Sequence, residues 1–347
     1  MKQFTIGSTE KELRLDQYLL RLMPGAGKSF LYKMLRKKNI TLNSKKADGN
    51  ERLCQGDVIC IFFSDETFEK FRKSNEVQRT VQTAVSVPAN KRQLQIPVIY
   101  EDDDILIADK PAGVLSQKAQ ADDYSLNDWF LDYLKQQEPE LIQEQTDNAT
   151  ALAYTPSVAN RLDRNTSGLI LCGKSLVGLR YLAEVLRDRS LHKYYLAVVN
   201  GRVVREQEIE GYLYKDEKTN VVTVTASDRQ GDYICTAYRP LVYIKEQDVT
   251  LIEVLLKTGK THQIRAHLAS IGHGLVGDPK YGNRCKNEFY KQQYGIKRQL
   301  LHCYKLAFAQ KNDSDISVCG KIITCAPPND FKKVTGEIYG NLEFPRS

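Results

Sequence analysis

Apolar positions in the first 63 residues recur at helical spacing and then at strand spacing. Residues 13–22 and 30–38 each place leucines along one face of an amphipathic helix, and Ser29 is positioned to cap the second helix. Two short runs, 40–43 and 58–63, are rich in β-branched and aromatic residues, which favour strands. The pattern predicts a small N-terminal domain in which two helices precede short strands.

The pattern changes after residue 64. The next 26 positions, 65–90, are polar and charged with little sustained apolar periodicity, which favours a linker. Beyond it, helical spacing at 125–134, where Ser125 can cap, and at 176–186 alternates with β-branched runs. The runs that favour strands are 169–171, 221–225, 235–238 and 250–255.

These segments lack the regular strand-helix-strand order of a doubly wound parallel sheet. We therefore predict an α+β protein whose larger domain has strands that pair mostly antiparallel. The predicted organisation is a small domain at 1–64, a linker at 65–90 and a larger domain at 91–347.

Charge is concentrated in the small domain. Residues 1–63 hold twelve Lys or Arg and six Asp or Glu, or +6 of the overall +7. A compact basic domain suits a polyanion, because each neutralised phosphate releases counterions. The basic residues cluster on the second predicted helix, which favours RNA or DNA binding over a merely soluble face. The candidate contacts are Arg14, Lys33, Arg36, Lys37 and Lys38.

Composition excludes several other classes. The eight cysteines form no Cys-x-x-Cys pair and have no histidine at zinc-finger spacing, so we expect neither a disulfide framework nor a metal site. His262 and His267 lie five positions apart and not at the i, i+4 spacing of a helical metal pair. The chain shows no secretory signal and no apolar run long enough to span a membrane, so we expect a cytoplasmic protein.

Two segments imitate a phosphate-binding loop. Residues 25–29 read Gly-Ala-Gly-Lys-Ser, but Leu22 stands where the motif needs its first glycine, and a helical pattern precedes it where a strand is required. Residues 254–261 fail similarly, with Val254 in the first glycine's place. We predict no binding of a nucleoside triphosphate and no nucleotide cofactor.

The candidate chemistry lies between residues 160 and 169. Asp163 stands between Arg161 and Arg164, and opposite charges nearby keep a carboxylate ionised. Residues 166–168, Thr-Ser-Gly, can bend the chain sharply before a buried strand resumes. Taken alone, such a sequence is also typical of a solvated salt bridge.

Arg-Leu-Asp-x-x-Thr-Ser-Gly-Leu resembles the signature of the RluA-type RNA pseudouridine synthases. The resemblance extends from about residue 96 to 330, and the first domain is similar to the small S-four-like RNA-binding domain, with an Arg-Leu-Asp helix start and a Gly-Asp turn. The further blocks follow in the family's order: Lys110-Pro111-Ala112-Gly113, Lys193 to Gly201, Thr258 to Arg265, Gly277 to Gly282 and Leu300 to Leu306.

The resemblance implies a mixed sheet with an RNA cleft, and an enzyme that isomerises uridine to pseudouridine without a cofactor. It implies that Asp163 is the essential residue, attacking the sugar or removing a ribose proton to give a glycal. Tyr195 would stack on the uracil and is a candidate for proton removal from carbon, Arg265 would pair with Asp163, and Arg161 would fill the space of the flipped base. From the residues alone, Tyr195 could be a core tyrosine, Arg265 an exposed helix residue, and Arg161 a phosphate contact or part of a local salt bridge.

Two departures from the family pattern are present: Asn160 replaces a histidine and Lys260 replaces an arginine. We expect structured RNA, most of all large-subunit ribosomal RNA, as the substrate of a monomer. The alternatives are a noncatalytic RNA-binding or ribosome-assembly factor that retains the fold, and a nucleoside hydrolase, which the basic domain disfavours.

Overall fold

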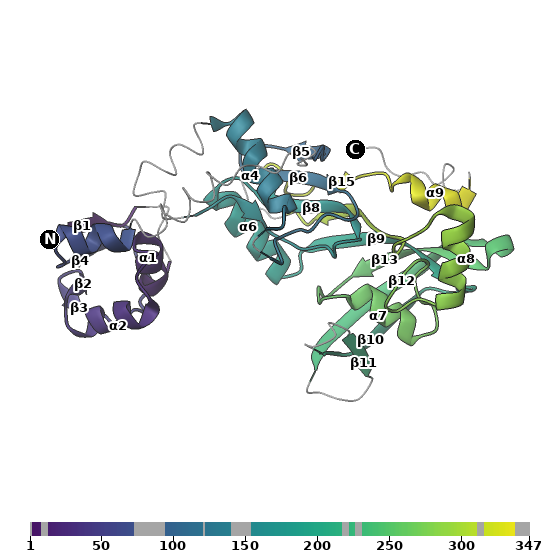
Figure 1. Cartoon of the computed structure of the whole chain (residues 1–347), viewed down its shortest axis with the longest axis horizontal. Helices are drawn as coiled ribbons and strands as arrows, with labels where there is room; N and C mark the ends of the chain where they lie inside the picture. The colour runs from purple at the N-terminus through teal and green to yellow at the C-terminus, as the bar shows by residue number, and fades with distance from the viewer. Residues whose placement is uncertain are drawn as a thin grey trace. The chain divides into compact units, whose positions relative to one another are not determined.

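The computed structural model describes residues 2–7, 13–72, 94–120, 122–139, 154–216, 222–225, 231–310 and 316–336. The chain divides into two compact units. One unit is Met1–Leu94 with Asp132–Thr155, and the other is Gln95–Leu131 with Pro156–Ser347. The labels in Figure 1 identify the helices and strands of each unit.

The first unit packs α1 and α2 against a four-stranded antiparallel sheet with strand order β1-β4-β2-β3. Both predicted helices and both predicted strands are present, but the pattern missed two short strands. Ser29 is not a cap, because the second helix begins at Lys28 with Gly27 as its N-cap and no capping side chain. The elements are β1 (Lys2–Thr5), α1 (Leu15–Leu22), α2 (Lys28–Arg36), β2 (Ile40–Leu42), β3 (Lys45–Lys46) and β4 (Val58–Ile61).

The start of the predicted linker is wrong. Residues 65–72 form a helix, in which Phe68 is only 1% exposed and joins the core of the first unit. Phe71 packs against the same core, three residues and one helical turn later. Two aromatic residues at this spacing give one apolar face, which was too short to register as periodicity in a charged stretch. Residues 73–90 of the predicted linker lie outside the described residues.

The second unit is built on one large sheet with strand order β11-β10-β12-β13-β9-β14-β8-β6-β5. Strand β15 also pairs with β14, and β7 with β8. Its described strands pair antiparallel except β8 with β14, which confirms a mixed, mostly antiparallel sheet in an α+β fold. The strands are β5 (Val98–Glu101), β6 (Ile105–Lys110), β7 (Ser157–Val158), β8 (Ser167–Gly173), β9 (Leu191–Asn200), β10 (Gln207–Lys215), β11 (Val222–Thr225), β12 (Asp232–Ile244), β13 (Val249–Leu256), β14 (Leu301–Phe308) and β15 (Ile322–Thr324).

Both predicted helices of the larger domain form, each with a serine at its start. The backbone N–H of Asp128 donates to Ser125 Oγ at 3.4 Å, and Gly178 N–H donates to Ser175 Oγ at 2.9 Å. The predicted strand at 221–225 is present from residue 222, and Val221 lies outside the described residues. The helices are α4 (Leu126–Gln137), α6 (Leu176–Arg187), α7 (Gln263–Ser270), α8 (Arg284–Tyr294) and α9 (Asn329–Thr335), with a 3₁₀ turn at Lys245–Gln247.

Strand β9 separates two hydrophobic clusters. Tyr195 and Ala197 belong to the cluster that contains residues of α6 and α7, whereas Leu196 belongs to the cluster that contains residues of α8 and α9. This alternation is the period-two pattern of a strand buried on both faces. It directs Tyr195 toward the side of the sheet that carries α6 and α7. Within the described part of the chain, no helix is long and apolar enough to cross a membrane.

Candidate active site

Asp163 lies in an irregular loop between β7 and β8, and the neighbouring Leu162 anchors this loop. The Leu162 side chain is buried in the core. Its backbone N–H donates to Ser116 Oγ at 3.0 Å, and the same hydroxyl donates to the Leu162 carbonyl at 2.9 Å. A turn closes directly afterwards, with Thr166 N–H donating to the Asp163 carbonyl at 3.0 Å. The backbone on both sides of Asp163 is therefore fixed.

Lys110 holds the same loop in place through hydrogen bonds to backbone carbonyls. Its fully buried ammonium donates to the carbonyl of Arg164 at 3.1 Å and to that of Val114 at 2.8 Å. Gly113 N–H donates to the same Arg164 carbonyl at 2.8 Å. Burial lowers the pKa of Lys110 to about 7. The Lys-Pro-x-Gly block, to which we gave no role from sequence, thus holds the loop that carries Asp163.

Gly168 allows β8 to meet β14 closely. It has φ +114°, and a Cβ at this position would lie 2.2 Å from the Cys303 carbonyl oxygen. Gly168 pairs with Cys303 in the parallel register of the two strands. Only glycine fits this conformation and this space. The close pairing of β8 with β14 therefore requires the glycine of the Thr-Ser-Gly segment. This pairing in turn positions the loop that carries Asp163.

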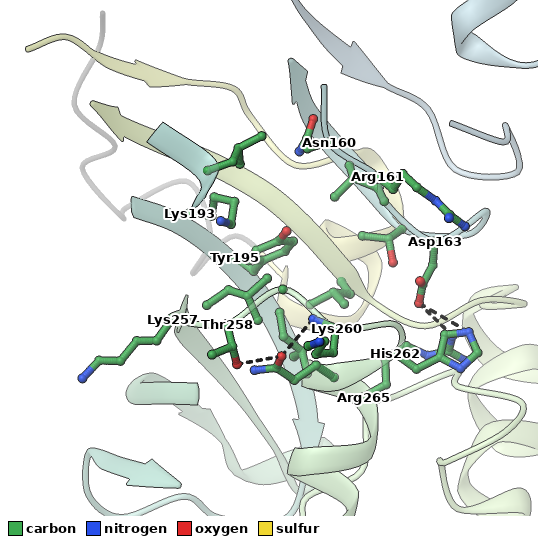
Figure 2. A pocket seen from close by; sticks show the side chains of 18 of the residues that line it. Asn160, Arg161, Asp163, Lys193, Tyr195, Lys257, Thr258, Lys260, His262 and Arg265 are labelled. Carbon is green, nitrogen blue, oxygen red and sulfur yellow. Dashed lines mark hydrogen bonds and ion pairs between the residues drawn. The ribbon is translucent and has the colours of Figure 1, made fainter. Parts of the chain in front are cut away.

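An ion-pair network joins Asp163 to α7. Arg265 Nη1 donates to Asp163 Oδ2 at 2.9 Å, while Nε and Nη2 donate to the two oxygens of Asp278 at 2.7 and 2.9 Å. His262 Nε2 lies 3.9 Å from Asp163, and dashed lines in Figure 2 mark the contacts of Asp163. Burial opposes the charge of Arg265, but the two carboxylates outweigh it and raise its pKa. The same bonds lower the pKa of Asp278 despite its burial.

The two arginines nearest in sequence are not ion-pair partners of Asp163 among the described residues. Arg161 is exposed and lines the cleft, and Arg164 Nη2 lies 3.9 Å from Asp123. The sequence predicts that these flanking guanidiniums are the partners of the carboxylate. The prediction is wrong because the segment turns directly after Asp163, and Arg265, 102 positions away, provides the contact.

Tyr195 lies on β9, four per cent exposed, with its side chain lining the cleft. Tyr194 packs against the other cluster, so the two tyrosines lie on opposite faces of β9. Burial raises the pKa of Tyr195 well above its ordinary value. The neutral phenol is therefore strongly favoured.

These groups surround a cleft of about 500 Å³. The three predicted catalytic residues and Arg161 all line it, and Figure 2 shows them around the same space. Sequence reasoning missed Asp278 and Lys193, although both lie inside motif blocks that we recognised. The signal for Asp278 is a carboxylate set between a glycine and a proline, where a tight turn can bury it. Further lining residues are Thr166, Lys257, Thr258, Gly259 and Lys260.

Two clusters in the described residues have side chains of metal-ligating type. Asp109, His302 and Cys325 place ligand atoms within 4.8 Å of one another, as do Glu208, Glu210 and Cys235. In the first cluster, Cys325 Sγ lies 3.4 Å from His302 Nε2, and Ser167 Oγ lies 3.0 Å from His302 Nδ1. These contacts satisfy both ring nitrogens by hydrogen bonds within the protein.

Comparisons with known proteins agree with this geometry. The model of the RNA pseudouridylate synthase family matches residues 104–270. The chain is 31% identical to the ribosomal large subunit pseudouridine synthase C of Rickettsia bellii, covering 86% of this chain and 90% of that protein. It is 30% identical to the protein of the same name from Vibrio vulnificus, covering 85% and 84%. The chain belongs to the RNA pseudouridylate synthase family.

The fold comparison also finds pseudouridylate synthases. The structure of human RNA Pseudouridylate Synthase Domain Containing 4 aligns with a TM-score of 0.52 at 17% identity, covering 72% of this chain and 94% of that chain. At this identity the likeness shows the fold alone. The family resemblance that we predicted from the motif blocks is confirmed.

Both departures from the synthase pattern have structural partners. Asn160 Oδ1 accepts a hydrogen bond from Leu171 N–H at 2.8 Å and so ties the start of the loop to β8. Lys260 Nζ contacts Asp232 at 2.7 Å, and its backbone N–H donates to Gln263 Oε1 at 3.0 Å. Neither residue contacts Asp163 directly among the described contacts. The substitutions therefore leave the Asp163–Arg265 pair intact.

The candidate RNA contacts of the first unit fall into two groups. Four residues on or just after α2 are exposed: Lys33, Arg36, Lys37 and Lys38. Arg14 instead makes a bidentate contact with Asp16 at 3.1 Å and donates to Asn50 Oδ1 at 2.6 Å. Its guanidinium is thus already engaged within the first unit, whereas the four α2 residues have no carboxylate partner among the described residues.

Proposed function

We propose that this protein isomerises specific uridines to pseudouridine in structured RNA, with large-subunit ribosomal RNA as the substrate. The observation that carries the proposal is the Asp163–Arg265–Asp278 network at the wall of a cleft that also contains Tyr195. The names of the relatives in Rickettsia bellii and Vibrio vulnificus support the choice of RNA. Because one chain carries both a basic unit and the cleft, we propose that it acts as a cytoplasmic monomer.

The reaction breaks the bond between ribose C1′ and uracil N1, and the electron pair leaves with the base. The base turns, its C5 forms a bond to C1′, C5 loses a proton, and N1 gains one. No atom is gained or lost overall, so no oxidant or cofactor is required. Asp163 either attacks the sugar or removes a ribose proton, and both routes use the carboxylate that Arg265 orients.

Tyr195 serves in this proposal as a stacking surface for the flipped base. An aromatic ring can stack on any base face, and the ring of Tyr195 lines the cleft. Its strongly raised pKa argues against a role as the base that removes the proton from C5. Arg161, exposed on the cleft wall, is placed to occupy the space left by the base or to contact a phosphate.

The first unit is the proposed RNA-holding part, similar to an S-four-like domain. Its exposed α2 lysines and arginine offer charge without a described carboxylate partner, which suits contact with the phosphate backbone. We place the catalytic domain at 91–347 and extend the RNA-binding domain from 64 to 72, because residues 65–72 pack on its core.

Release of tritium from uridine labelled at C5 tests the proposal. The purified protein is expected to release tritium from large-subunit ribosomal RNA, and Asp163→Ala to release none. Mapping of pseudouridine in RNA from cells with and without the protein then locates the site. Full tritium release by Asp163→Ala would overturn the catalytic assignment. Rescue of a deletion by the same variant would favour the noncatalytic assembly factor, and free uracil would favour a hydrolase.

A further inference from the structure

Lys193 has no role in the proposed mechanism, although it lines the same cleft as Asp163. It precedes Tyr195 by two positions on β9, so both side chains leave the strand on the same face. Figure 2 shows both residues at the wall of the cleft. Lys193 is partly buried, and burial lowers its pKa. A lysine placed here lies beside the ring on which the uracil is proposed to stack.

Three other cations of the cleft already have carboxylate partners. Arg265 is bound by Asp163 and Asp278, Lys260 Nζ lies 2.7 Å from Asp232, and Lys257 Nζ lies 2.5 Å from Glu208. Arg161, Arg187 and Arg189 are exposed side chains at the edge of the cleft. For Lys193, no ion pair or hydrogen bond of the ammonium is present among the described residues. Its three N–H donors are available to a ligand in the cleft.

The chemistry of the reaction needs such a donor. When the C1′–N1 bond breaks, the electron pair moves into the uracil ring, and the negative charge spreads to its two carbonyl oxygens. An ammonium that is aimed at a carbonyl oxygen before the bond breaks stabilises this charge, as donors in an oxyanion hole do. The partial burial of Lys193 strengthens the interaction, because less water competes for the charge.

We propose that the Lys193 ammonium donates a hydrogen bond to a carbonyl oxygen of the flipped uracil and stabilises the charge that the base acquires as it leaves the ribose. The inference rests on the proposed function. Lys193 keeps its proton throughout, so the bond changes and the proton balance of the reaction are unaltered. Contact with O4 would also disfavour cytosine, which has an amino group at that position.

A chemical double-mutant cycle tests the contact. The substrate is a synthetic oligoribonucleotide spanning the mapped uridine, with oxygen at both carbonyls or with sulfur at position 2 or 4. Sulfur is a weaker hydrogen-bond acceptor. We expect Lys193→Met to slow single-turnover isomerisation of the uridine substrate by about 10²–10³-fold. At the contacted carbonyl, sulfur should lower the rate of the wild type by a larger factor than it lowers the rate of Lys193→Met. The reason is that the variant has no hydrogen bond at this position to lose.

The intrinsic effect of sulfur on the leaving base is common to both enzymes and cancels in the comparison. Lys305→Met is the matched control, since Lys305 lies on neighbouring β14 beside Tyr194 and contacts Glu253 at 3.2 Å. It is expected to show the same sulfur effects as the wild type. If Lys193→Met does not fold, Lys193→Arg replaces it, because the longer guanidinium moves the donor and should also weaken the coupling.

Additive effects of Lys193→Met and sulfur at both positions would overturn the inference and leave Lys193 as a structural residue. Coupling at either position supports it and identifies the carbonyl. Failure of the wild-type protein to isomerise the unmodified oligoribonucleotide is a different outcome, because it would overturn the proposed function itself.

Discussion

Asp278 binds Arg265 through two hydrogen bonds of 2.7 and 2.9 Å, and its carboxylate is fully buried. It also accepts hydrogen bonds from the backbone N–H groups of Lys280 and Tyr281. The guanidinium is therefore fixed on one edge by a carboxylate that is itself fixed, and its Nη1 donates to Asp163. The orientation of the Asp163 carboxylate depends in this way on a residue that does not touch it.

Replacing Asp278 by asparagine should therefore slow catalysis without abolishing folding. The amide keeps the shape of the side chain but offers one acceptor in place of two and removes the charge. We expect kcat to fall by about 10–100-fold with little change in KM, because such a supporting contact acts through orientation. Tritium release under saturating RNA measures it. Asp278→Ala should cost about 3–5 kcal/mol of stability, because it leaves Arg265 buried with part of its charge uncompensated.

Asp248→Asn is the control for this substitution, since Asp248 forms an exposed ion pair with Lys286 at 2.9 Å. It is expected to leave the rate of isomerisation unchanged. An unchanged kcat for Asp278→Asn would show that Asp163 does not depend on the bidentate support of Arg265.

Gly168 should tolerate no side chain. An added Cβ would lie 2.2 Å from the Cys303 carbonyl and would hold an L-residue at φ +114°. We expect Gly168→Ala to lower the free energy of unfolding by more than about 2 kcal/mol, from backbone strain and the clash together. Gly259→Ala is the matched control, because its Cβ would meet nothing within 4 Å. Urea unfolding followed by circular dichroism compares the two, and equal midpoints would contradict the role of Gly168 in joining β8 to β14.

The alternation of residues along a strand predicts some features of the site but not its long-range contacts. The period-two geometry of a strand is enough to place Tyr194 and Tyr195 on opposite faces of β9, as the structure has them. The partner of Asp163 could not be found this way, since local charge pointed to its sequence neighbours. The resemblance to the family motifs identified Arg265 as the partner of Asp163. No sequence pattern, however, relates Lys110 to the carbonyl of Arg164, 54 positions away. Such contacts form only when the strands assemble into the sheet and bring distant segments of the chain together.

His302 should make the protein sensitive to mild acid. The ring is fully buried, and burial lowers its pKa to about 3, below the value of about 6.5 in an unfolded chain. Between pH 6.5 and 3 the unfolded state therefore binds a proton that the folded state does not, and stability falls as the pH falls through this window. From pH 7 to 4.5 this one residue should cost about 2 to 3 kcal/mol.

The comparison of the wild type with His302→Asn isolates this contribution, because all other titrating groups are common to both. Asparagine can retain a hydrogen bond with Ser167 without taking up a proton. Urea unfolding at pH 7 and 4.5 should therefore show a smaller loss of stability for the variant, even if it is less stable at pH 7. An equal loss for both proteins would mean that His302 takes up its proton over the same pH range in the folded and unfolded states.

The exposed lysines that follow α2 should bind RNA through its phosphates. Replacing Lys37 and Lys38 together by glutamine removes two charges without touching the cleft of the second unit. Because each phosphate contact releases counterions, the slope of log affinity against log salt concentration should become shallower by roughly 1 to 2. Filter binding of a large-subunit ribosomal RNA fragment at several salt concentrations measures the slope. The matched control is Lys332→Gln with Lys333→Gln, two exposed lysines on α9, which should leave the slope unchanged. If both pairs of substitutions flatten the slope equally, the attraction comes from net charge and the α2 surface has no special role.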